Sequence, residues 1–153
     1  MVAMNMSKPP LGRDRIHRFG RGQDGNPLLA SGWGEPEAGF VWSEGKVSTL
    51  RVPLTSPIAE LSLSVWGYSP PGVPAQDLLV FVNGALRGHF VVKEKAVHRL
   101  QGPFDAGRDG LEVAFFIPSA TSPEIAEGTD DKRQLGIALA AIQLHEAEAQ
   151  KAA

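Results

Sequence analysis

The sequence predicts an all-β protein, an antiparallel β-sandwich of the jelly-roll or galactose-binding-like kind with about eight strands. Gly and Pro supply 17 and 12 of the 153 residues, a larger share than in an average protein, which indicates many turns. Apolar residues alternate with polar ones over several short segments, as in strands with one buried face. The chain has no convincing long helical segment and no internal repeat.

Composition narrows the class of protein. Apolar residues make up 42% of the chain and the formal net charge is only −2, which argues against a disordered chain. The length is sufficient for a hydrophobic core without covalent staples. The chain contains no cysteine, which excludes disulfides, thiolate catalysis and cysteine-bound zinc.

The expected organisation is a flexible N-terminal arm at 1–14, one β-sandwich domain at 15–145 and a C-terminal tail at 146–153. No apolar run reaches the length of a membrane span, and the N-terminus lacks the apolar stretch of a signal peptide. We therefore expect a cytoplasmic location. The basic charges of the arm are few and interrupted by acids, so we expect no nucleic-acid partner.

Four segments carry the strand pattern most clearly. Residues 50–54, 61–65 and 113–117 each alternate apolar and polar side chains, which predicts strands with one face in the core. Residues 135–144 are apolar on both parities, which predicts a central or covered strand.

The dipeptide Asn83-Gly84 gives the most specific turn signal, because a type I′ turn needs positive φ at both central residues. It predicts a hairpin of strands 78–82 and 85–92.

A second hairpin is expected to follow, with its turn near Lys93-Glu94 and a return strand at 96–100. Its register would place His89 opposite His98. We favour a surface cross-strand pair over a metal site, because no third ligand is evident in the sequence.

Two further patterns resemble functional motifs but lack the required context. Residues 20–25 spell G-x-G-x-x-G, yet another Gly- and Pro-rich stretch follows them instead of a helix, so we predict a loop and no nucleotide cofactor. The loop at 105–109 contains aspartates without the regular ligand spacing of a calcium site. We therefore assign no metal ligand and no cofactor; the alternative is a structural calcium ion at this loop.

Asp130 and Asp131 are adjacent, so in an extended segment they point to opposite sides and are poorly placed as an acid/base couple. A role in fixing a turn, together with Thr129, is favoured. Arg133 is expected to pair with a carboxylate of the same loop or with Glu37; the alternative is a ligand contact. We assign no catalytic residue, and an enzyme is disfavoured because spacing assembles no convergent titratable group.

The aromatic residues suggest binding. Trp66 and Phe116 fall on faces that the alternation marks as polar, where an indole could stack on a sugar ring or on a partner's side chain. The alternative is that a loop, a bulge or a second layer covers them. Trp33 and Trp42 belong to the loop-rich segment 31–45 and either plug the end of the sandwich or line a cleft.

A set of short motifs carries a resemblance over about residues 16–144. The motifs are Gly32-Trp33, Pro36-Glu37, Trp42-Ser43-Glu44-Gly45, Phe81-Val82-Asn83-Gly84 and Asp131-Lys132-Arg133-Gln134-Leu135-Gly136. Together they resemble a galactose-binding-like β-sandwich accessory module that occurs with bacterial phosphoglycerol-transferase-type and glycosyltransferase proteins of surface-glycan synthesis.

The resemblance implies a non-catalytic companion to polysaccharide synthesis that contacts a saccharide or the enzyme itself. The hypothesised contacts are stacking by three tryptophans and polar bonds to sugar hydroxyls from three charged residues: Trp33, Trp42, Trp66, Glu37, Asp131 and Arg133. The alternative is a protein-interaction or homo-oligomerisation subunit that docks on a glycosyltransferase through its exposed aromatic face.

Overall fold

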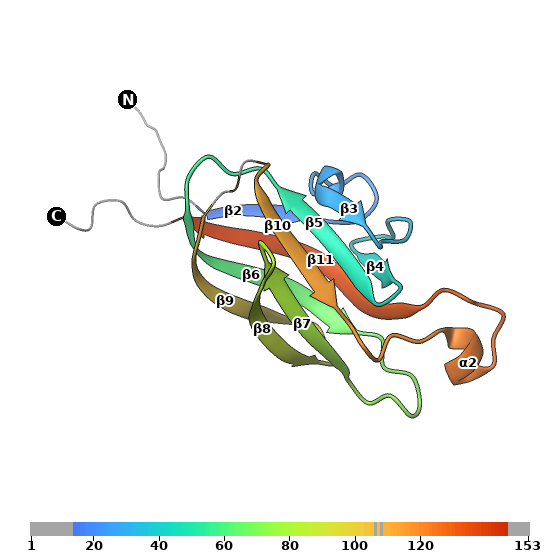
Figure 1. The fold of residues 1–153 in the computed structure, drawn as a ribbon. Helices are drawn as coiled ribbons and strands as arrows, with labels where there is room; N and C mark the ends of the chain where they lie inside the picture. The colour runs from blue at the N-terminus through green and yellow to red at the C-terminus, as the bar shows by residue number, and fades with distance from the viewer. Residues whose placement is uncertain (1–13, 106, 108, 147–153) are drawn as a thin grey trace.

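The structure, a computed structural model, describes residues 14–105, 107 and 109–146. These residues form ten strands, one 3-10 helix and one short α-helix (Figure 1). In chain order the elements are β2 Asp14–Arg18, η1 Asn26–Leu28, β3 Leu29–Ser31, β4 Val41–Glu44, β5 Val47–Val52, β6 Ile58–Gly67, β7 Gln76–Val82, β8 Ala85–Val92, β9 Ala96–Phe104, β10 Leu111–Phe116, α2 Pro123–Glu127 and β11 Leu135–Glu146.

The strands form two antiparallel sheets packed face to face (Figure 1). The front sheet has the strand order β3-β5-β10-β7-β8, and the back sheet has the order β2-β11-β6-β9, with β4 also paired to β11. The predicted antiparallel sandwich is confirmed. The strand count exceeds the expected one because the loop-rich region also contributes the short strands β3 and β4.

The core lies between the sheets and is built by the alternation that the sequence shows. The inward positions of β5, β6 and β10 are completely buried, and full burial of one such side chain is worth about 1.5–3 kcal/mol. They include Leu50, Val52, Leu61, Leu63, Val65, Val113 and Phe115.

β11 is an inner strand of the back sheet, with partners on both edges, as its apolar sequence predicts. It pairs with β6 on one edge, while β4 and β2 occupy successive lengths of the other edge. The register with β6 shifts between Leu139 and Ala141, which is a bulge that reverses the parity of the strand. Ile137 before the bulge and Ile142 after it therefore both belong to the core, and this explains why both parities are apolar.

The hairpin at Asn83-Gly84 is confirmed. The two residues have φ of 50° and 86°, and Val82 pairs directly with Ala85 across the turn. The Asn83 side chain also accepts a hydrogen bond from the Glu112 backbone N–H at 3.0 Å, which ties the turn to β10.

The expected second hairpin is wrong. β8 pairs with β7 in the front sheet and β9 pairs with β6 in the back sheet, so the chain crosses between the sheets at 93–95. His89 therefore does not face His98: it lies 3.4 Å from Asp77, and His98 is opposite Leu63. The crossing lets the His98 ring pack against Phe90 of β8, with 5.0 Å between ring centroids.

The glycine-rich segment 20–25 forms turns and is followed by only the three-residue η1, so the helix that a dinucleotide site needs does not follow this motif. Asp14 and Glu146, which the prediction assigned to the arm and the tail, are strand residues; the rest of those segments lies outside the described residues. Within the described part of the chain, no helix is long and apolar enough to cross a membrane.

The pKa of His98 is lowered from its ordinary value of 6.5 by burial. The unfolded chain therefore binds this proton more strongly than the folded one, so the free energy of unfolding should fall as the pH drops below 6.5. We expect His98→Gln to reduce this fall in urea denaturation on both sides of that pH. Equal pH profiles for wild type and His98→Gln, with circular dichroism showing that the variant is folded, would contradict the assignment.

Candidate functional site

Four aromatic side chains gather on the outer face of the back sheet, beside β4. The Phe40 ring centroid lies 5.5 Å from that of Trp42 and 4.9 Å from that of Trp66, and the Trp42 centroid lies 6.0 Å from that of Tyr68. All three contacts are edge-to-face, which is a favourable geometry for aromatic pairs. All four residues are half-buried. We refer to Phe40, Trp42, Trp66 and Tyr68 as the aromatic cluster.

The register of β11 explains why the cluster forms. Ala138 of β11 pairs with Trp42 of β4 on one side and with Trp66 of β6 on the other. Directly opposite residues of antiparallel strands share one face of the sheet, with Cβ atoms about 5 Å apart. The small Ala138 side chain leaves room for both indoles, and it is fully buried beside them.

Charged groups surround one end of the cluster. Arg133 Nη2 lies 2.6 Å from Asp131 Oδ2 and Arg133 Nε lies 2.9 Å from Asp131 Oδ1, a two-pronged contact. Arg133 Nη1 is 3.8 Å from Glu37 Oε2. Hydrogen bonding from Arg133 lowers the pKa of Asp131 to about 2. Both expected partners of Arg133, the carboxylate of its own loop and Glu37, are thus confirmed.

The turn role of this loop is also confirmed. Thr129 Oγ1 accepts a hydrogen bond from the Asp131 N–H at 3.2 Å, and Asp131 Oδ1 accepts one from the Arg133 N–H at 3.0 Å. Glu37 joins the cluster through the backbone, because its N–H donates to the Phe40 carbonyl at 2.8 Å.

Tyr68 links the cluster to α2, since its hydroxyl donates a hydrogen bond to the Glu127 carboxylate. Burial and this carboxylate raise the pKa of Tyr68 to about 12. α2 is held in place at both ends: the Ser122 hydroxyl accepts from the Ile125 N–H at 3.2 Å, and Gly128 ends the helix with φ of 74°.

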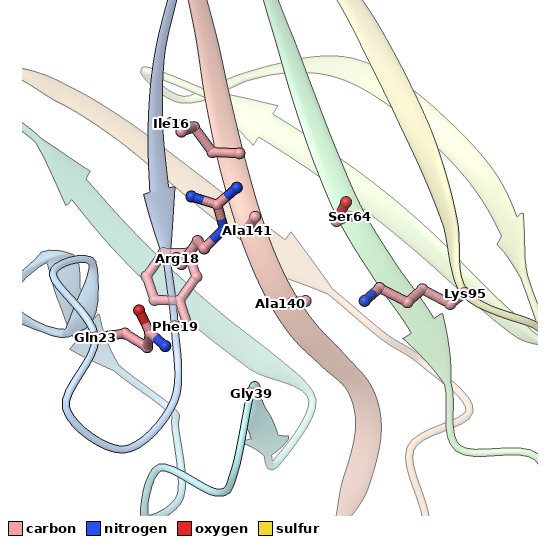
Figure 2. Close-up of a pocket in the computed structure, with 9 residues that line it drawn as sticks. All are labelled: Ile16, Arg18, Phe19, Gln23, Gly39, Ser64, Lys95, Ala140 and Ala141. Carbon is pink, nitrogen blue, oxygen red and sulfur yellow. The ribbon is translucent and has the colours of Figure 1, made fainter.

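An open groove of about 300 Å³ lies on the same face (Figure 2). Trp66 adjoins it, because Ser64, two positions earlier on β6, lines the groove. Its floor consists of the small residues Ser64, Ala140 and Ala141, at the bulge of β11. Lys95 borders the groove and also contacts the aromatic cluster, with its ammonium 5.7 Å from the centroid of the Trp66 ring. The remaining lining residues are Ile16, Arg18, Phe19, Gln23 and Gly39.

Most of the sequence-predicted site residues meet in this region. Trp42 and Trp66 form the cluster, and Glu37, Asp131 and Arg133 form the adjoining charged network. Trp66 is half-buried, because the Phe40 ring covers part of it. The alternative that another part of the chain covers Trp66 is therefore correct in part.

Trp33 lies apart from the cluster and plugs the sandwich. Its indole N–H donates to the Thr49 carbonyl at 2.8 Å, and its ring contacts the core residue Phe115 edge-on, with 5.8 Å between centroids. Phe116 is 37% exposed on the front sheet, and therefore also belongs to a different surface.

Sequence reasoning missed four residues of this region: Phe40, Tyr68, Arg18 and Lys95. The first two had a signal, because Phe40 precedes Trp42 by two positions and Tyr68 follows Trp66 by two, the spacing of side chains on one face of a strand. Arg18 and Lys95 had none, because only the tertiary arrangement brings β2 and the crossing segment to the same groove. In the described ranges, no three His, Asp or Glu side chains are grouped closely enough to hold a metal ion.

No protein-family model matches the chain, and no curated protein sequence matches it. Among solved structures the fold is similar to the CBM36-1 domain of a multidomain xylanase from the hindgut metagenome of Trinervitermes trinervoides. The TM-score is 0.53 at 10% identity, over 89% of this chain and 99% of that domain. This likeness shows a shared β-sandwich fold.

Two further structures match at lower scores. One is the carbohydrate-binding module CBM36 in complex with calcium and xylotriose, with a TM-score of 0.43 and 9% identity over 86% of this chain and 98% of that one. The other is a family GH115 4-O-methyl-α-glucuronidase, with a TM-score of 0.48 and 12% identity over 76% of this chain and 15% of that one. At these scores neither adds to the fold assignment.

The raised pKa of Tyr68 can be measured directly, because Tyr68 is the only tyrosine of the chain. We expect phenolate absorbance to appear with a midpoint near pH 12 in the folded protein. Glu127→Gln should lower this midpoint, since it removes the carboxylate that opposes ionisation, and burial should keep it above the ordinary value of 10.0. An unchanged midpoint in Glu127→Gln, with circular dichroism showing a folded protein, would contradict the contact.

Trp33 is expected to stabilise the fold without contributing to a binding surface. Trp33→Phe removes the hydrogen bond to the Thr49 carbonyl, and we expect a loss of about 1 kcal/mol in the free energy of unfolding. Urea denaturation measures the loss. A stability equal to wild type, or a weakened affinity for any ligand of the aromatic cluster, would show that this role is wrong.

Proposed function

We propose that the chain is a non-catalytic carbohydrate-binding module that holds a saccharide along the outer face of the back sheet. One observation carries the proposal: the aromatic cluster and the open groove adjoin on one face of a sheet, joined by Trp66 and Lys95. The similarity of the fold to the CBM36-1 domain supports it.

The chemistry of the cluster suits a sugar. Pyranose rings carry C–H groups on their faces, which pack on indole rings, while their hydroxyls need hydrogen-bonding partners nearby. Trp42 and Trp66 supply apolar surface, and the partly exposed Glu37 and Arg133 supply polar groups beside it. Because the site is open and half-buried, we expect weak binding, in which a few contacts offset the cost of association.

The motifs that resemble accessory modules of surface-glycan synthesis support a setting in that process, in the cytoplasm and beside a glycosyltransferase.

Docking on such an enzyme, or self-association, is the second candidate function. An apolar patch on the front sheet favours it: Phe116 and Val47 pair across β10 and β5 and are 37% and 53% exposed. This patch is on the sandwich face opposite the aromatic cluster.

The proposal predicts that the cluster tryptophans carry saccharide affinity. Trp66→Ala and Trp42→Ala should each weaken oligosaccharide binding about tenfold, through lost stacking and lost apolar burial. Calorimetric titration measures the dissociation constant, and tryptophan fluorescence follows binding by the wild type.

Phe116→Ala is the matched control, because it removes an exposed aromatic ring from the other sheet. It should leave saccharide binding unchanged. If no surface oligosaccharide changes the fluorescence or gives heat of binding, the carbohydrate proposal fails. If Phe116→Ala abolishes self-association or capture of a glycosyltransferase, the second candidate is supported.

A further inference from the structure

We infer that the groove beside Trp66 selects acidic saccharides, binding a uronate carboxylate or a sulfate ester between Arg18 and Lys95. The inference rests on the proposed function and adds the charge class of the ligand. It rests on three observations: the positions of the two cations, the absence of acidic side chains among the described residues that line the groove, and the small side chains of its floor.

The two cations border the groove from different elements. Arg18 of β2 pairs with Ala141, which in turn pairs with Ser64 of β6, so these three residues form one row across the outer face. Lys95 lies in the crossing segment beyond β6. Figure 2 shows the guanidinium of Arg18 beside Ala141 and the ammonium of Lys95 directed toward the floor from the opposite side.

No carboxylate neutralises these cations among the described residues. Four other arginines pair with acids: Arg15 with Glu146, Arg51 with Glu112, Arg99 with Glu60, and Arg133 with Asp131 and Glu37. No ion pair joins Arg18 or Lys95 to a described acid, and none of the nine residues lining the groove is acidic.

Asp14, the acid nearest to Arg18 in sequence, lies 3.1 Å from the His145 ring. Asp24, the next nearest, is also directed to other partners. Its carboxylate accepts the Arg18 backbone N–H at 3.2 Å and lies 3.5 Å from the His17 ring. In a chain whose net charge is −2, two cations on either side of one neutral hollow form a local positive field that an anionic ligand group would complement.

The floor and rim suit a sugar that carries one anionic group. Ala140 and Ala141 leave a shallow floor, the Ser64 hydroxyl and the Gln23 amide border it, and Trp66 adjoins it through Lys95. The guanidinium fork of arginine matches a carboxylate or a sulfate, whereas lysine acts as a point charge. Two cations are few for a nucleic-acid strand, which is bound along many phosphates. A saccharide is therefore the better match.

The test compares charged and neutral oligosaccharides of the same length on the full chain. The probes are an oligogalacturonate, a neutral galacto-oligosaccharide and a sulfated galacto-oligosaccharide. We expect an acidic probe to bind about tenfold more tightly than the neutral one at low salt, with a preference that shrinks as salt rises. The uronate and sulfate arms show which anionic group the groove takes.

Substitution then locates the preference. Arg18→Gln and Lys95→Gln should each weaken acidic-probe binding about fivefold and weaken neutral-probe binding by a smaller factor, so that the preference for the acidic probe shrinks. Lys93→Gln and Arg51→Gln remove the same charges outside the groove, from exposed positions, and should leave both affinities unchanged. Circular dichroism and thermal melting check that every variant folds.

The outcomes separate this inference from the proposed function. If acidic and neutral probes bind equally while Trp66→Ala abolishes both, the acidic selectivity is wrong and the carbohydrate module stands. If Arg51→Gln or Lys93→Gln reduces binding as much as the groove variants, or if single-stranded DNA binds as well as the acidic probes, the effect is general charge attraction and the inference fails. If no saccharide binds, the proposed function itself fails.

Discussion

The backbone pairing of β11 is the constraint on which the back sheet depends. β11 bonds to β6 along most of its length, and its other edge is shared by β2 and β4. Because side chains alternate, a slip of one residue in this strand would turn its core face outward. A regular strand could not keep both Leu139 and Ile142 in the core, since they differ by an odd number of positions. The bulge between them resolves the conflict.

The same bulge determines the outer surface. Between the two buried apolar runs it leaves Ala140 and Ala141, whose small side chains form the groove floor beside Ser64. On the N-terminal side of the bulge, Ala138 lies between Trp42 and Trp66 in the sheet. Larger side chains at these positions would fill the groove or separate the indoles. Core packing and the candidate binding surface therefore depend on the same few residues of one strand.

Much of the fold could be predicted from the sequence, where the signal is local. Alternation identified β5, β6 and β10, because a half-buried strand has a period of two. The turn at Asn83-Gly84 was predicted because few dipeptides adopt positive φ readily. The crossing at 93–95 was missed, since a short polar link can join neighbouring strands of one sheet or pass to the facing sheet. The chain passes to the facing sheet, where the His98 ring of β9 packs against Phe90 of β8. This contact between two sheets leaves no signal in the local sequence pattern.

The residues of the candidate site could likewise be predicted only where the sequence signal is local. Glu37 and Arg133 could be paired in advance because an arginine in a loop needs an acceptor, and few carboxylates were available. The aromatic cluster was predicted only in part: cover over Trp66 was one of two expected outcomes, but the residue that covers it, Phe40, was not identified. The Trp33 indole could have plugged the end of the sandwich or lined a cleft, and the choice depends on its non-local contacts with the Thr49 carbonyl and the Phe115 ring. Arg18 belonged to no motif, so only the register with Ala141 reveals its place.

The charges of this face are distributed unevenly, and this matters for binding. Near α2 the guanidinium of Arg133 is already engaged by Asp131 and Glu37, so an external anion would have to compete with ligands held by the same chain. Such exposed pairs add little to stability, but two carboxylates against one guanidinium leave no excess positive charge in this network. At the groove, Arg18 and Lys95 have no such partner among the described acids. A saccharide lying along the sheet would therefore meet stacking and hydrogen-bonding contacts near Trp42 and a positive field beyond Trp66.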